Sequence, residues 1–140
     1  MFQQILLATD GSEHSLRATE RAIELARHLP SAQVEVVYVI DAAKTRHEVL
    51  QSHSDDDLLA DLRSSRLYET ETKIKAAGLS YSIKVLHGEP GPSIVHHANQ
   101  KEADLVIIGS RGRNALQEMV LGSVSHKVAK RANCPVMIVK

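Results

Sequence analysis

Short apolar runs alternate with stretches of helical period along the whole chain, and this alternation limits the fold more than any other feature of the sequence. Apolar residues spaced three and four apart predict helices, whereas short β-branched runs between turn residues predict buried strands. The predicted strands are residues 5–8, 34–40, 81–86, 105–108 and 135–139, and the predicted helices are residues 12–29, 55–77, 93–101 and 123–132. Because crossovers between parallel strands are right-handed, this order predicts an α/β fold. We expect a single open, mostly parallel five-stranded sheet with helices on both faces, in which the alternating residues 81–86 form a strand with one more polar face.

The connections follow from local stop signals. Residues 41–54 have no clean period and are expected to form a connection. The aspartates at 55–57 favour the start of one long helix that Gly78 ends. Residues 88–92, which contain two glycines and two prolines, predict a rigid turn. The length of 140 residues suits one domain, residues 1–140.

Charge and composition exclude several classes of partner. Lys+Arg and Asp+Glu both number 17, which argues against nucleic-acid binding by bulk electrostatics and leaves no net charge to oppose self-association. No apolar stretch approaches the ~20 residues of a membrane span, and the N-terminus lacks the pattern of a secretory signal. Cys134 is the only cysteine, so a reducing compartment fits. We therefore expect a cytoplasmic protein that binds neither nucleic acid nor membrane.

Two strand ends are the candidate positions for a ligand site. In open α/β sheets, ligands bind beyond the carboxyl ends of the strands, where the strand order reverses. The first strand ends at Ala8, Thr9 and Asp10, and the fourth ends at Ile108 and Gly109. If these strands are neighbours, both ends line one crevice.

Glycines follow the fourth strand at fixed offsets. Gly109 and Gly112 allow a sharp bend whose N–H groups point at a ligand, and Gly122 stands at the start of the last predicted helix. The free N–H groups and positive dipole end of a helix favour an anion. Each such contact is worth only ~0.3–1 kcal/mol, so tight binding needs several donors on one multiply charged group, such as a polyphosphate. Glycine spacing alone fits plain turns equally well.

The spacing Gly109-x2-Gly112-x9-Gly122-Ser123 resembles the nucleotide-binding pattern of the universal stress protein family, and it matches neither the P-loop nor the dinucleotide fingerprint. The opening ILLATDGSEHS is similar to that family's first strand and loop, and VEVVYVID resembles its second strand. The stretch from ADLVIIGSRGR to CPVMIVK is similar to its C-terminal signature. Residues 41–80 show no such similarity and argue neither for nor against the resemblance. The resemblance implies a Rossmann-like fold of the adenine-nucleotide alpha hydrolase type, with the strand order 3-2-1-4-5.

The resemblance also implies a ligand, ATP, with Mg²⁺ or Mn²⁺ bound through the phosphates rather than through protein side chains. The Asp10 carboxylate would lie near the ribose hydroxyls, and Arg111 stands at a variable position of the motif. The residues at the adenosine end would be Ala8, Thr9, Asp10 and Val39. The loop over ribose and phosphates would be formed by Ile108, Gly109, Arg111 and Gly112. The β- and γ-phosphates would be bound by Gly122, Ser123, Val124 and Ser125.

Simpler structural roles exist for several of these residues. Asp10 fits a helix cap, and Ser123 and Ser125 fit caps whose geometry also binds phosphate. The histidines do not predict a metal site, because the adjacent His96 and His97 would point to different faces of a helix. His14 is expected at the surface.

Three functional hypotheses follow. The first is an ATP-responsive homodimeric stress or signalling module, and the second is a nucleotide-independent interaction module of the same fold, against which the intact glycines argue. The third is a genuine ATP-consuming enzyme, which the lack of an evident water-orienting residue disfavours. At most slow ATP hydrolysis is expected, and no catalytic residue is predicted. Residues 135–139 are expected at the sheet edge, where pairing with a symmetry mate would form the dimer. No particular protein partner is predicted.

Overall fold

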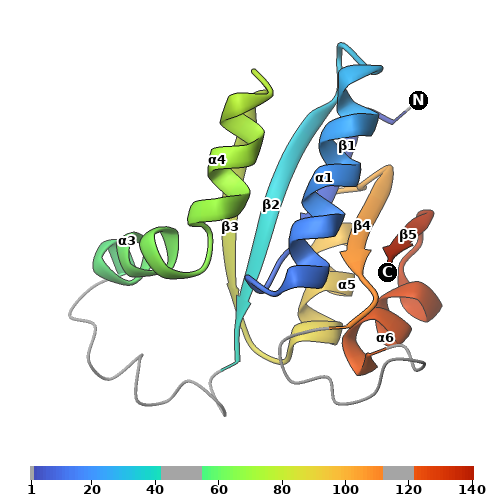
Figure 1. The fold of residues 1–140 in the computed structure, drawn as a ribbon. Coiled ribbons are helices and arrows are strands. Elements are labelled where there is room, and N and C mark those ends of the chain that lie inside the picture. Colours follow the sequence, from blue (N-terminus) through green and yellow to red (C-terminus); the bar gives the residue numbers. More distant parts are fainter. Residues whose placement is uncertain (1, 42–54, 112–121) are drawn as a thin grey trace.

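Five parallel strands form one sheet in the order β3-β2-β1-β4-β5, which confirms the predicted order. The structure is a computed structural model that describes residues 2–41, 55–111 and 122–140. The strands are β1 (Gln4–Ala8), β2 (Gln33–Ile40), β3 (Tyr81–His87), β4 (Leu105–Gly109) and β5 (Val136–Val139). As predicted, the last strand lies at an edge of the sheet (Figure 1).

The helices cover both faces of the sheet. They are α1 (Glu13–Arg27), α3 (Asp55–Ser65), α4 (Tyr68–Ala76), α5 (Pro90–Gln100) and α6 (Ser123–Arg131). Side chains of α1, α3 and α4 join one buried cluster with the sheet, and those of α5 and α6 join a second cluster on the opposite face. Figure 1 shows α1 and α4 in front of the strands and α5 behind them.

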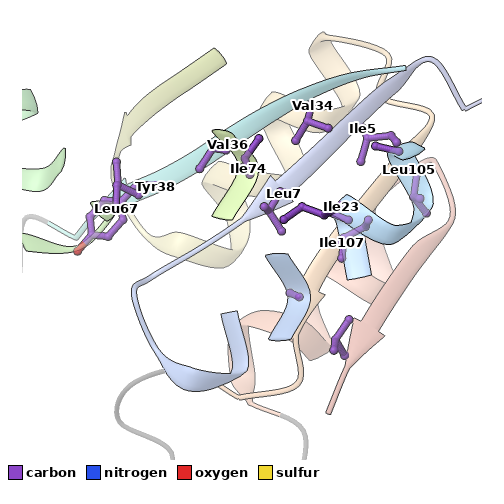
Figure 2. Close-up of a cluster of buried hydrophobic side chains, with 14 of the residues drawn as sticks. Ile5, Leu7, Ile23, Val34, Val36, Tyr38, Leu67, Ile74, Leu105 and Ile107 are labelled. Atoms are coloured by element: carbon purple, nitrogen blue, oxygen red, sulfur yellow. The ribbon is translucent and has the colours of Figure 1, made fainter. Parts of the chain in front are cut away.

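The two central strands divide their side chains between these clusters. Ile5 and Leu7 of β1 face the α1 side, where Figure 2 shows them among the large buried residues, and Leu6 and Ala8 face the α5 side. Successive residues of a strand point to opposite faces, so a strand covered on both sides must be apolar throughout. This accounts for the uninterrupted apolar runs that end at the candidate site.

Two predicted boundaries were wrong. Residues 55–77 form two helices rather than one, because the chain makes a wide turn in which the N–H of Leu67 donates to the carbonyl of Leu62, five residues back. Leu67 is fully buried there, so core packing rather than a glycine or proline stops α3. The second difference is that α5 begins at Pro90, three residues earlier than predicted, since proline is tolerated in the first turn of a helix.

A side-chain cluster fastens α3, α4 and the β3 edge together. Arg63 donates to both carboxylate oxygens of Glu71, at 2.8 and 3.2 Å, and the Tyr81 hydroxyl donates to the same carboxylate at 2.6 Å. Burial raises the pKa of the Glu71 carboxyl, but the hydrogen bonds from Arg63 and Tyr81 outweigh it, so the net pKa lies below its ordinary value. Glu71 is therefore held as a buried, fully paired anion.

We expect Glu71→Gln to lower the free energy of unfolding by about 1–3 kcal/mol, because hydrogen bonds to a charged group are lost in a buried place. Urea denaturation at pH 7 measures it. The pKa of the folded carboxyl is depressed, so the wild type keeps this contribution above the unfolded pKa and loses it as the pH falls below about 4.3. Glu20→Gln, which breaks only the exposed pair with Lys73, is the matched control and should change stability by less than ~0.5 kcal/mol. Equal effects of the two variants would contradict this role for Glu71.

Candidate nucleotide site

The ends of β1 and β4 lie side by side at one rim of the sheet. The strands are paired in parallel with Ala8 opposite Ile108, and the strand order reverses between them. Both side chains are buried in the core on the α5 side. Ala8 and Ile108 therefore present backbone, rather than side chain, to anything bound at the rim.

The turn from β1 into α1 satisfies its own polar groups. The Thr9 hydroxyl donates to Ser15 Oγ at 3.0 Å, and the N–H of Ser12 donates to Asp10 Oδ1 at 2.9 Å. Ser12 is the N-cap of α1, and its Oγ accepts from the N–H of Ser15. Gly11 between them has φ +82°, a conformation that glycine adopts without strain. Asp10 thus closes a local turn, while Ser12 carries the cap.

The two glycine-marked bends of the motif meet at the carbonyl of Ser110. This oxygen accepts from the N–H of Gly122 at 2.7 Å and from the Ser125 hydroxyl at 2.8 Å. The N–H of Ser110 donates to Val139 at the end of β5. The start of α6 is therefore fastened to the end of β4, although twelve residues separate Ser110 from α6.

The start of α6 differs from the start of α1. Its N-cap is Gly122, and no side-chain hydrogen bond caps it in the part of the chain that the structure describes. The N–H groups of Ser123, Val124 and Ser125 have no intrahelical acceptor, as at the start of any helix. Ser123 is exposed, Val124 packs against the second cluster, and the Ser125 hydroxyl is engaged with backbone carbonyls. An anion here would meet backbone amides and the Ser123 hydroxyl.

His14 was expected at the surface, and the structure shows it half-buried against the end of β4. Its Nε2 lies 2.9 Å from Arg111 Nη2 and its Nδ1 lies 3.3 Å from Ser110 Oγ. Burial, followed by the positive charges of Arg111 and Arg17, lowers the pKa of His14. His14 has these contacts because α1 crosses close over the end of β4, and the sequence does not predict this crossing.

That crossing also explains one glycine of the motif. A Cβ built on Gly109 would lie 2.8 Å from the backbone carbon and the Cβ of His14. Gly109 therefore has a packing role between β4 and α1, whatever it does toward a ligand.

The remaining predicted residues are placed as follows. Val39, near the carboxyl end of β2, packs against the second cluster, and Gly112 lies outside the described residues. The structure adds Arg66, whose backbone lies against Gly11 from the turn between α3 and α4. Within the described ranges, no three His, Cys, Asp or Glu side chains are grouped to hold a metal ion. His96 is exposed and His97 buried, so the two do face different ways.

We expect Gly109→Ala to destabilise the fold by about 1–3 kcal/mol, because the new methyl group meets backbone that cannot move independently. Urea denaturation measures the change. Gly91→Ala is the control, since its Cβ would meet only the flexible side chain of Lys127, and its effect should stay within ~0.5 kcal/mol. If the two substitutions cost the same, the crossing at Gly109 is looser than the distances indicate.

Comparison with known proteins identifies the family. The universal stress protein family model matches residues 1–140. The chain therefore belongs to the universal stress protein family. No helix in the described part of the chain has both the length and the hydropathy needed to cross a bilayer.

Relatives and solved structures support this assignment. Universal stress protein YxiE of Bacillus subtilis is 35% identical over 149 residues, which cover 100% of both chains. A solved structure from Methanocaldococcus jannaschii is 27% identical with a TM-score of 0.83, covering 100% of this chain and 96% of that one. The universal stress protein of Archaeoglobus fulgidus, solved in complex with dAMP, is 26% identical with a TM-score of 0.71, and the match covers 100% of both chains.

Proposed function

We propose that this protein binds ATP at the rim formed by β1, β4 and the start of α6, and that occupancy of the site biases its conformation and its choice of partner. The observation that carries the proposal is the uncapped start of α6, fastened beside the switch point of the sheet. A helix that supplies no cap of its own leaves its first amides for a ligand. The dAMP complex of the Archaeoglobus fulgidus relative supports an adenine nucleotide.

The ligand would lie with its base toward β2 and its phosphates toward α6. Val39 and the backbone of Ala8 and Thr9 would contact adenosine, and the Asp10 carboxylate would bind the ribose hydroxyls. The amides of residues 123–125 would bind the β- and γ-phosphates, and Arg111 would add positive charge from the end of β4. Gly109, Gly112 and Ile108 would shape the loop, and the Gly122 amide would hold α6 in place rather than contact phosphate.

A divalent ion fits this site only through the nucleotide. Mg²⁺ takes oxygen ligands and usually keeps several waters, with one or two carboxylates and the phosphates completing its shell. The described residues offer no cluster of three ligating side chains. The phosphates and water would therefore supply its ligands, and the ion would offset phosphate charge.

We expect Mg-ATP to raise the thermal stability of the protein. At ~100 times the dissociation constant, the stabilisation should be about 2.7 kcal/mol. A thermal melt with and without Mg-ATP measures it. Unchanged melting at saturating Mg-ATP would favour the nucleotide-independent interaction module instead.

Gly122→Val serves as the matched variant for this experiment. The branched side chain would stand at the start of α6, where phosphate is expected, so ATP should no longer protect the variant. The N-cap backbone, at φ −64° and ψ 155°, accepts a valine without strain. Full protection by ATP in this variant would show that the phosphates bind elsewhere.

We also propose a homodimer that forms through the edge strand, residues 135–139. An unpaired sheet edge is a template for another strand, and a two-fold pairing closes it. β5 lies at the edge, and Met137 is one of the two large apolar side chains that are exposed among the described residues.

We expect Met137→Lys to shift the protein from twice the mass of one chain to the mass of a single chain, because a charge would be buried in the interface. Light scattering after size exclusion measures the mass. Tyr68→Lys, which changes the other exposed large apolar side chain on α4, is the control and should remain dimeric. A monomeric wild type, or a dimeric Met137→Lys variant, would contradict the proposed interface.

A further inference from the structure

The contacts of His14 define its protonation state. An arginine guanidinium has only N–H donors, so the nitrogen that faces it must accept. The 2.9 Å contact between Arg111 Nη2 and His14 Nε2 therefore requires an unprotonated Nε2. A neutral ring then carries its proton on Nδ1, which donates to Ser110 Oγ, 3.3 Å away.

We propose that His14 is a positioning residue that holds the Arg111 side chain at the rim for the anionic end of the ligand. The imidazole stands on the first turn of α1, and its backbone is locked against Gly109. The ring thus offers a fixed acceptor that restricts the Arg111 side chain before a ligand binds, which lowers the entropy cost of binding. Its effect on nucleotide affinity rests on the proposed function, whereas the hydrogen bond itself does not.

The charges around His14 favour the neutral ring. Arg111 from the end of β4 and Arg17 from α1 repel a proton on the ring, while Glu13 and Asp10 attract one. Burial adds to the two arginines, and the pKa of His14 lies below its ordinary value as a result. Protonation would remove the acceptor and place two positive groups in contact, so the ring releases Arg111 when it is charged.

The first test needs no nucleotide. NMR of the ¹⁵N-labelled free protein at pH 8 should show His14 as the Nδ1–H tautomer, and the absence of its signals in the H14Q variant assigns them. In R111A the proton should move toward Nε2 and the pKa of His14 should rise. Arg17→Ala is the matched control: it removes a charge from the same surroundings but should leave the tautomer unchanged. An Nε2–H tautomer in the wild type would overturn the proposal.

The second test is a double-mutant cycle on ATP affinity. R111A and H14L should each weaken binding about tenfold, and the double variant should also be about tenfold weaker, because His14 acts through Arg111. H14Q, whose side-chain oxygen can accept from Arg111, should restore most of the affinity. A hundredfold loss in the double variant, or no loss in H14L, would refute the positioning role. If the wild type binds no ATP, the proposed function fails, and the NMR result still decides the hydrogen bond.

Discussion

The carbonyl oxygen of Ser110 is the acceptor on which the site depends. It takes the Gly122 amide and the Ser125 hydroxyl together, and in doing so places the first turn of α6 at the end of β4. Because the Ser125 side chain is buried, water does not compete for this hydrogen bond. Together with the packing of Val128 in the second cluster, it holds the amides of residues 123–125 beside the strand end.

The two helices that begin at this rim, α1 and α6, differ in how their N-termini are capped. At the start of α1, the side chains of Asp10, Ser12 and Ser15 form hydrogen bonds with backbone groups of the same turn, so those groups are already paired. The first turn of α6 starts at a glycine and is left uncapped in the described structure. A capped helix gains stability, and an uncapped one keeps donors for a ligand. Because α4 and α5 also begin without a side-chain cap, it is the position of α6 beside the switch point that singles it out as the proposed phosphate end.

Much of this architecture could be predicted from local patterns. Apolar runs predicted β1, β2, β4 and β5, because a parallel strand covered on both faces is mostly apolar, and the alternation of residues 81–86 predicted the edge strand β3. That the first and fourth strand ends share one rim was expected from the strand order that the family resemblance implies, and the pairing of β1 with β4 confirms it. The break between α3 and α4 could not be predicted, since no glycine or proline marks it and the burial of Leu67 produces it. The contacts of His14 could not be predicted either, because the sequence does not show which residue of α1 lies against the end of β4.

The sequence by itself determined the order of strands and helices, the rim at which a ligand would bind, and the family, because these depend on periodicity and on a motif carried by neighbouring residues. Only the tertiary structure decided which donors of that motif remain available. The Gly122 amide and the Ser125 hydroxyl both donate to the Ser110 carbonyl. Gly109 allows the close approach of α1, and His14 contacts Arg111 at the end of β4. Each of these contacts joins residues far apart in the chain or across an intervening loop, so packing of the whole domain sets them.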